Sequence, residues 1–468
     1  MNITSSRPNI IFIFGDQMRA SSPGFMGVEK VYTPNLDSFA REGTAFTRAI
    51  SNTPVCAPAR ATLFSGMHPL RHGVVFNDVA LRTDIQSLAL CLNEIGYRCG
   101  YIGKWHLDTE DRGIYVPPGP RRQGFNDYWA AHNCNHHYFE GYYYLNDDPN
   151  PIWIDGFEPE VQTELAINYI AEKSNGNDPF CMFLSWGPPH CPYLEVPKKY
   201  LDMYPVEDIQ LKPNAVETAD KRQIAGYYAQ ITALDEYFGK ILQAVEENGL
   251  RENTIVIFTS DHGDMLFSHN RGWKCKPWLE SVNVPFLARW PGKIPRERVS
   301  DGLLGIVDIA PTLLSLCGAD IPAEMQGTDL SELFMGNETA SPDSAFIGMP
   351  VVPLAFSYPE WRGVMTKHTT YARFREEPWI LYDDNNDPFQ LTNLVHSPAH
   401  QDLLIEMEER LQGWLKCLDD PFETTLEVCS KYYQGAINGE MHYYENEIIR
   451  LGKAERRRRR LSQGSEPQ

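Results

Sequence analysis

Short apolar runs alternate with amphipathic stretches through roughly the first 320 residues. The apolar runs have the length and composition of buried strands and cover residues 10–14, 99–102, 180–184, 254–259 and 284–289. The amphipathic stretches have helical spacing and cover residues 34–42, 85–95, 160–173, 219–247 and 308–316. This alternation predicts an α/β fold with a mainly parallel sheet flanked by helices. At the start of the first helix, Thr33 is the expected N-cap and Pro34 the first helical residue.

The pattern changes after about residue 350. Residues 361–365, 370–374 and 379–382 predict short antiparallel strands, and a helix is expected over residues 400–418. We therefore expect a catalytic domain at 1–350, a small α+β domain built on an antiparallel sheet at 351–452, and a disordered basic tail at 453–468. The five arginines 456–460 are expected to be a solvated chain end.

Composition narrows the range of partners. The 468 residues carry a net charge of −20, which argues against nucleic-acid binding because that function needs a basic surface. No apolar run approaches the ~18 residues of a membrane span. The first residues do not resemble a signal peptide, so we expect a cytoplasmic protein, or a periplasmic or secreted one if a leader has been removed. The ten cysteines include no CxxC pair, which argues against a disulfide framework or a zinc ribbon.

Four of the predicted strands lead into chemically capable polar residues. These residues are Asp16 and Gln17, Lys104 and His106, His190, and Asp261 and His262. In an open parallel sheet the binding site lies beyond the carboxyl ends of the strands. A single such residue is more often an ordinary loop residue, but four strand ends of this kind predict one shared pocket.

Asp16, Gln17, Asp261 and His262 form a candidate metal site. Three oxygen donors and an imidazole suit a hard divalent ion better than zinc. Ca²⁺ and Mg²⁺ are both ions of this kind. In the alternative interpretation, Gln17 and His262 only hydrogen-bond their neighbours.

The pentapeptide Cys56-Ala-Pro-Ala-Arg60 is a second candidate feature. Pro58 favours the first turn of a helix, so Cys56 would lie at a helix N-terminus, where free N–H groups favour an anion. Arg60, one turn later, could reach the same anion or the side chain of residue 56.

These residues resemble the sulfatase family. Cys56-Ala-Pro-Ala-Arg60 is similar to its C-x-P-x-R signature, whose cysteine is oxidised to formylglycine. Further similar segments are Thr33-Pro-Asn-Leu-Asp37, Gly103-Lys-Trp-His-Leu107, Ser260-Asp-His-Gly263 and, near the C-terminus, Leu381-Tyr-Asp followed by Asp387-Pro. The resemblance implies an alkaline-phosphatase-like fold and one bound divalent cation, for which we expect Ca²⁺, with Mg²⁺ and Mn²⁺ as alternatives. It also implies a formylglycine-generating enzyme as a partner that matures Cys56.

The resemblance also implies a role for each residue. Asp16, Gln17, Asp261 and His262 would bind the metal, and residue 56, as an aldehyde hydrate, would be the nucleophile. The other implied roles belong to basic side chains. Arg60 and Lys104 would hold the hydrate, and His106 would accept a proton from it. His190 would protonate the leaving alcohol, and Lys274 would contact the sulfate, with Lys276 as a weaker candidate for that contact.

Two positions depart from the family pattern. Ala59 stands where many members have Ser, and Gln17 stands where many have a second Asp. Gln17 in place of Asp removes a negative charge from the metal site. The combination of Asp-Gln with Asp-His also resembles the phosphonate monoester hydrolases. Hydrolysis of a phosphonate or phosphodiester therefore stays an alternative.

Residues 132–144, His-Asn-Cys-Asn-His-His-Tyr-Phe-Glu-Gly-Tyr-Tyr-Tyr, form a segment dense in histidine and tyrosine. Aromatic rings stack on sugars and imidazoles bind hydroxyls, so His136 and His137 are candidate substrate contacts; a packed structural insertion is the equal alternative. The segment resembles bacterial carbohydrate sulfatases, especially those acting on N-acetylglucosamine 6-sulfate. The other alternative is a protein that binds sulfated sugars but does not catalyse a reaction.

Overall fold

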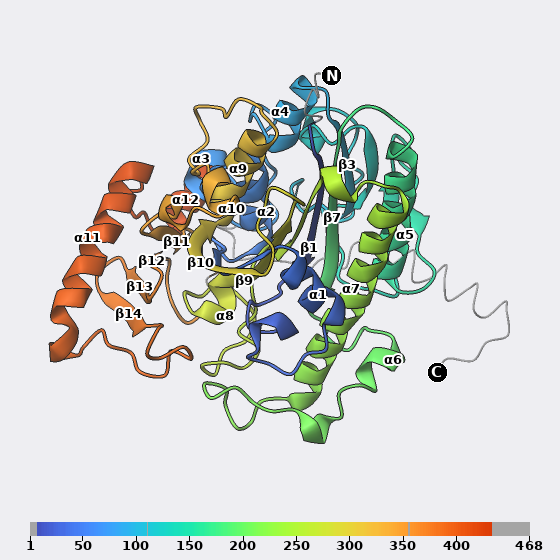
Figure 1. The fold of residues 1–468 in the computed structure, drawn as a ribbon. Helices are drawn as coiled ribbons and strands as arrows, with labels where there is room; N and C mark the ends of the chain where they lie inside the picture. The colour runs from blue at the N-terminus through green and yellow to red at the C-terminus, as the bar shows by residue number, and fades with distance from the viewer. Residues whose placement is uncertain (1–6, 110, 354–355, 433–468) are drawn as a thin grey trace.

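The computed structural model describes residues 7–109, 111–353 and 356–432 (Figure 1). A large sheet forms the centre of the molecule and a smaller sheet lies at one side of it. The predicted basic tail at 453–468 falls outside the described residues. No described helix is long and apolar enough to cross a membrane.

The large sheet has ten strands in the order β10-β2-β9-β8-β1-β7-β3-β4-β5-β6. Their bounds are β1 Asn9–Asp16, β2 Thr44–Ile50, β3 Arg98–Lys104, β4 Tyr128–His132, β5 Tyr142–Leu145, β6 Ile152–Trp153, β7 Phe180–Pro189, β8 Thr254–Ser260, β9 Asn283–Arg289 and β10 Arg298–Gly305. The five strands predicted from apolar runs correspond to β1, β3, β7, β8 and β9.

Strand direction explains where the site forms. The central strands β8, β1, β7, β3 and β4 run parallel to one another, so their carboxyl ends share one edge. Strand β9 departs from the expected parallel layer, because it pairs antiparallel with both β8 and β2. At the other end, β5 and β6 are also antiparallel. The sheet is therefore mixed, with a parallel centre.

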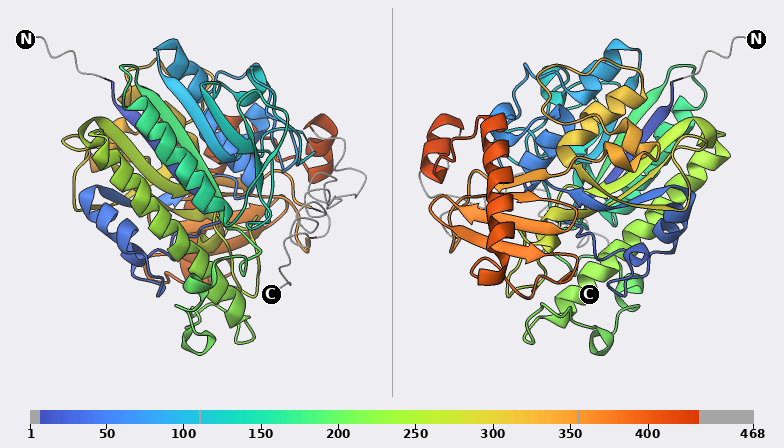
Figure 2. Two further views of the ribbon diagram at one scale, coloured as in Figure 1. Left: turned by 90° about the vertical axis from the view of Figure 1, so that its right-hand side faces the viewer. Right: turned by 60° about the vertical axis from the view of Figure 1, so that its left-hand side comes forward.

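Helices cover both faces of this sheet (Figure 2). Their bounds are α1 Pro34–Glu42, α2 Cys56–Ser65, α3 Pro69–His72, α4 Leu88–Glu94, α5 Glu158–Lys173, α6 Lys198–Leu201, α7 Lys221–Glu247, α8 Leu279–Val282, α9 Ile309–Leu316 and α10 Ser331–Phe334. Strand β1 shows the division: Ile11 and Ile13 belong to the core shared with α1, α5 and α7, whereas Ile10 and Phe12 belong to the core shared with α2, α4 and α9. Successive residues of a strand point to opposite faces of the sheet, so a strand that is buried on both sides contributes apolar side chains to two cores.

The N-terminus of α1 is capped differently from the expectation. The side chain of Thr33 makes no capping bond; its hydroxyl donates to Asp37 at 2.9 Å. Instead Asp235 on α7 accepts from the backbone N–H groups of Asn35 and Leu36, at 3.1 and 2.7 Å. A carboxylate from a distant helix thus satisfies donors that a local side chain usually satisfies.

The smaller sheet is antiparallel, with strands β11 Ala345–Met349, β12 Trp361–Met365, β13 Thr369–Phe374 and β14 Pro378–Asp383. Helix α11, Gln401–Leu418, packs on β12 and β13 through Met407 and Leu411, and α12, Thr425–Tyr432, follows it. The first strand, β11, precedes residue 350, so this sheet begins one strand earlier than expected. A shared core, which includes Val75, Met265 and Trp361, joins the small sheet to the large one.

Candidate active site

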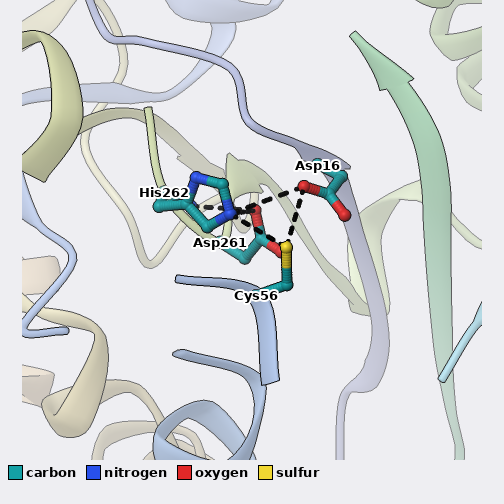
Figure 3. A group of neighbouring side chains, drawn as sticks. All are labelled: Asp16, Cys56, Asp261 and His262. Carbon is teal, nitrogen blue, oxygen red and sulfur yellow. Dashed lines mark hydrogen bonds and ion pairs between the residues drawn. The ribbon is translucent and has the colours of Figure 1, made fainter. Parts of the chain in front are cut away.

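Four side chains from three segments meet beyond the carboxyl edge of the large sheet. Asp16 ends β1, Cys56 begins α2, and Asp261 and His262 follow β8 (Figure 3). Their ligand atoms all lie within 4.8 Å of one another, and all four side chains are buried. The structure therefore brings together three predicted metal ligands and the predicted nucleophile.

Cys56 has charged and polar neighbours on several sides. Its Sγ lies 3.2 Å from His262 Nε2, 3.2 Å from Lys274 Nζ and 3.6 Å from Asp16 Oδ1. Burial and the charge of Asp16 raise the pKa of the thiol, but the charges of Lys104, Lys274 and His262 outweigh them and hold it well below its ordinary value. An anionic group at position 56 is thus stabilised by its surroundings.

Arg60 lies one turn along α2 from Cys56 and faces the carboxylates. Its guanidinium donates to Asp261 Oδ2 at 3.0 Å, to Asp16 Oδ2 at 3.3 Å, and to the backbone oxygen of Lys104 and the hydroxyl of Ser185, both at 2.7 Å. These four bonds use all three nitrogens of the guanidinium, and among the described residues no hydrogen bond runs from Arg60 to Cys56. In this state Arg60 holds the two aspartates in place.

Lys104, at the end of β3, is paired with Asp16 Oδ2 at 2.5 Å with both side chains fully buried. Burial raises the pKa of Asp16, but Lys104 and the other nearby cations hold it well below its ordinary value. Asp16 is therefore an anion that is available to a cation on its second oxygen, Oδ1.

The donor set fits a hard divalent cation. Asp16, Asp261 and His262 supply two carboxylates and an imidazole, and burial together with the charge of Asp16 raises the pKa of Asp261. Two buried carboxylates that repel each other gain most from a shared cation. An oxygen at position 56 in place of sulfur would complete a hard donor set.

Gln17 lies at this cluster with both ends of its amide in use. Its Oε1 accepts from Lys274 Nζ at 2.6 Å and its Nε2 donates to Asp264 Oδ2 at 2.7 Å. Asp264, which the sequence interpretation missed, also accepts from Tyr193 at 2.5 Å and is fully buried. The sequence does carry a signal for Asp264, because it is a carboxylate only two residues after the predicted ligand His262. Asp264 orients Gln17, and Gln17 orients Lys274 towards Cys56.

His190 follows β7 and stacks on His136. The two rings are nearly parallel, at 12°, with centroids 3.9 Å apart. His190 Nδ1 lies 2.7 Å from the backbone oxygen of Cys191, which assigns its N–H to that side and leaves Nε2 without a hydrogen-bond partner among the described residues. Burial and the charge of Lys274 lower the pKa of His190 to about 3.

His106 follows β3 and hydrogen-bonds to Asp78. Its Nε2 donates to Asp78 Oδ1 at 3.3 Å, and Arg112 holds the same carboxylate with two bonds of 3.0 and 2.8 Å. No hydrogen bond joins His106 to Cys56 within the described part of the chain. The sequence interpretation missed Asp78, whose only signal is its place in a loop after α3.

Two weaker candidates lie away from the cluster. Lys276 Nζ donates to the backbone oxygens of Gly272 and Lys274 and lies over the rings of Phe356 and Tyr358, so it supports the loop instead of facing Cys56. His137 is 37% exposed in its side chain and lies 3.5 Å from Glu195. His137 thus faces solvent beside the site, and Lys276 does not.

Residues 8–319 match the model of the sulfatase family, and residues 270–416 match that of the N-sulphoglucosamine sulphohydrolase C-terminal region. The chain belongs to the sulfatase family and is a sulfuric ester hydrolase of the alkaline-phosphatase-like fold, as the sequence predicts.

Three relatives illustrate the breadth of the match. An ulvan-active sulfatase of Formosa agariphila is 38% identical over 91% of this chain and 84% of its own length. An endo-4-O-sulfatase of Bacteroides thetaiotaomicron is 33% identical over 90% of this chain and 94% of its own length. The crystal structure of the sulfatase yidJ from Bacteroides fragilis superimposes with a TM-score of 0.81 at 31% identity, over 90% of this chain and 98% of that one. The expected likeness to N-acetylglucosamine-6-O-sulfatases is also present, at 25% identity over 90% of this chain and 89% of the Bacteroides thetaiotaomicron enzyme.

Proposed function

We propose that the protein hydrolyses a sulfate ester on a carbohydrate, with formylglycine made from Cys56 as its nucleophile. The observation that carries this proposal is the position of Cys56: it is the first residue of α2, buried among Asp16, His262 and Lys274. A hydrated aldehyde there supplies an oxygen nucleophile and a second hydroxyl whose deprotonation expels sulfate. The maturation enzyme is accordingly a required partner.

The fixed charges match an anionic substrate. Arg60, Lys104 and Lys274 outnumber the carboxylates of Asp16 and Asp261, and all five side chains are buried. Lys274 would contact a non-bridging sulfate oxygen, because its ammonium lies 3.2 Å from Sγ of Cys56, the side chain that would become the nucleophile. A divalent cation held by Asp16, Gln17, Asp261 and His262, Ca²⁺ in our proposal, would polarise the sulfate.

His190 would protonate the leaving alcohol through Nε2. In the structure the charge of Lys274 is among the causes that lower the pKa of His190. A bound sulfate group offsets that charge, so substrate binding favours the protonated imidazole that the step requires. His106 would take the proton released when sulfate leaves.

The carbohydrate assignment comes from the relatives and from the segment 132–144. The relatives' names include ulvan-active, endo-4-O- and N-acetylglucosamine-6-O-sulfatases. In this chain His136 stacks on the proposed acid, and the half-exposed His137 lies one residue further on, so both would meet the sugar that carries the sulfate. N-acetylglucosamine 6-sulfate is the first substrate to test.

The test begins with the maturation state. Protein co-expressed with a formylglycine-generating enzyme should yield a tryptic peptide that has lost the sulfur of residue 56 and reacts with a carbonyl probe. Matured protein is then assayed on sulfated sugars, and on an aryl sulfate paired with the matching aryl phosphonate. Much faster phosphonate turnover would transfer the assignment to phosphonate hydrolysis. Sugar binding without sulfate release would make the protein a binder.

A further inference from the structure

His190, the proposed acid, has contacts to a part of the chain far from it in the sequence. Locally, its Nδ1 lies 2.7 Å from the backbone oxygen of Cys191, and this contact fixes one edge of the imidazole. The face of the ring and the backbone of residue 190 are contacted by the segment 132–144 instead. Two residues of that segment, His136 and Tyr138, make these contacts.

Tyr138 holds the backbone of the acid. Its hydroxyl donates towards the backbone oxygen of His190 at 2.7 Å and that of Gly187 at 3.1 Å. The tyrosine is fully buried and packs closely on β7, since a Cβ at residue 187 would lie only 2.7 Å from its Cε1. Glycine at position 187 thus permits the close approach, and the hydroxyl ties the acid to the segment.

The backbone of Tyr138 is itself fixed on both sides. Its N–H donates to Glu195 Oε2 at 2.7 Å, and its oxygen accepts from the N–H of Glu158, also at 2.7 Å. Because Glu195 follows His190 in the same loop, Tyr138 contacts this loop both at the acid and beyond it. The tyrosine is therefore a fixed point against which His190 is held.

His136 covers one face of the acid's ring. The two rings lie at 12° with their centroids 3.9 Å apart, and Nε2 of His136 lies 3.5 Å from Sγ of Cys134, which anchors it. Burial and the charge of His190 hold the pKa of His136 well below its ordinary value, so His136 stays neutral when His190 is protonated. The face of a neutral aromatic ring attracts a cation stacked on it.

We propose that Tyr138 and His136 are positioning residues of the reaction, which together fix His190 so that its Nε2 faces the leaving oxygen of the ester. The inference rests on the proposed sulfatase function and deepens it by naming two residues outside the signature motif on which the acid depends. One edge of the ring, one face and the backbone are each constrained by a separate contact. Nε2 is the ring nitrogen that has no hydrogen-bond partner among the described residues.

Position matters because a general acid works only within hydrogen-bond reach, about 2.6–3.2 Å, of the oxygen that it protonates. A misplacement of about 1 Å can cost roughly 10²-fold in rate. In the step itself, the proton leaves Nε2 of protonated His190 and goes to the ester oxygen as the bond from that oxygen to sulfur breaks. Tyr138 and His136 neither gain nor lose a proton.

The variant Tyr138→Phe tests the backbone contact, because it removes the hydroxyl and keeps the ring. Tyr142→Phe is the matched control: Tyr142 is fully buried in the same segment, and its hydroxyl has no hydrogen-bond partner among the described residues. Each protein is matured, and turnover is normalised to its formylglycine content. Two substrates are compared, a sugar sulfate and 4-nitrophenyl sulfate, whose phenolate leaves readily without an acid.

Tyr138→Phe should lower kcat on the sugar sulfate by roughly tenfold and change KM and the rate on 4-nitrophenyl sulfate by less than about twofold. Tyr142→Phe should match wild type on both substrates. His136→Ala should behave like Tyr138→Phe, and His136→Phe should recover most of the loss, because a planar ring again covers the face of His190. A rise in KM for the sugar with kcat unchanged in His136→Ala would overturn the assignment of His136.

The sharpest measurement repeats Tyr138→Phe in a protein that carries His190→Gln. A residue that acts through the acid has nothing left to position there, so the second substitution should change kcat by less than about twofold. The same tenfold loss in that background, or an equal loss on both substrates, would overturn the inference. If Tyr138→Phe does not fold, His136→Ala takes its place in the same cycle.

Failure of the proposed function gives a different result. Matured wild type would then release no sulfate from either substrate, and both the function and the inference that rests on it would be overturned. An active wild type whose variants lose rate uniformly would overturn the inference alone.

Discussion

The two halves of the site differ in how their polar groups are satisfied. Around Cys56, Asp16, Arg60 and Lys104 each have a charged partner within 3.3 Å. In and beside the segment 132–144, by contrast, three histidines have a ring nitrogen with no partner among the described residues, namely Nδ1 of His106, His132 and His136. Buried groups without partners cost free energy, so a substrate or a proton that supplied the missing partner would stabilise them.

The difference separates two tasks. The Cys56 side is preorganised electrostatics, which needs no rearrangement when charge develops. The histidine side has ring nitrogens without partners among the described residues, so it is suited to transferring protons and to binding sugar hydroxyls. The predictions below test that division, from the largest expected effect to the smallest.

Cys56→Ala should remove the nucleophile and lower turnover of a sulfated sugar by at least about 10⁴-fold, because no other side chain in the pocket can form the hydrate. Sulfate release measured by ion chromatography checks this. Unfolding temperature serves as the control and should be nearly unchanged, and substantial residual turnover would contradict the assignment of residue 56.

Removal of divalent cations with a chelator should lower turnover by roughly 10³-fold, since the two carboxylates would then repel each other and the sulfate would lose its polarising ion. Ca²⁺ should restore activity, and Mg²⁺ and Mn²⁺ are compared with it. Binding also has a readout without turnover: at 100 times its Kd the cation should stabilise the fold by about 2.7 kcal/mol. Asp261→Asn should abolish this stabilisation. A stability that does not respond to any of the three cations would argue against the site.

His190→Gln should lower turnover of a sugar sulfate by roughly 10²–10³-fold, because an alkoxide leaves poorly without a proton. With 4-nitrophenyl sulfate, whose phenolate leaves readily, the loss should be much smaller. The ratio between the two substrates is the measurement. Equal losses on both would show that His190 does not act as the acid.

Lys274→Ala and Lys276→Ala form a matched pair on one loop. Lys274 contacts Cys56, so its loss should lower kcat/KM by about 10²-fold. Lys276 contacts backbone oxygens and aromatic rings instead, so its loss should lower the unfolding temperature and change kcat/KM by less than about threefold. The reverse order would place the wrong lysine at the sulfate.

His137→Ala should give the smallest effect, a rise in KM of roughly threefold with little change in kcat, because a half-exposed side chain contributes uniform binding to a sugar. Steady-state kinetics on a sulfated sugar and on 4-nitrophenyl sulfate check this. The aryl substrate lacks the sugar and should show no change.

The sequence alone determined the elements that carry the chemistry. Apolar runs predicted β1, β3, β7 and β8, because a buried strand leaves a direct hydrophobic signal in the sequence. Each of these strands ends at or next to the polar residues that were predicted to form the site. Helix α2 begins at Cys56, as Pro58 indicated. The convergence of Asp16, Cys56, Asp261 and His262 followed from one rule about parallel strands.

Only the tertiary structure decided which groups pair across the fold. It assigned Arg60 to the aspartates, made Asp235 the cap of α1 and directed Lys276 to backbone oxygens instead of Cys56. It also placed Asp78 beside His106, although the two residues are 28 positions apart in the chain. Local sequence reports propensity and burial, whereas partner choice depends on side chains that meet through long-range packing, and no local pattern encodes that meeting.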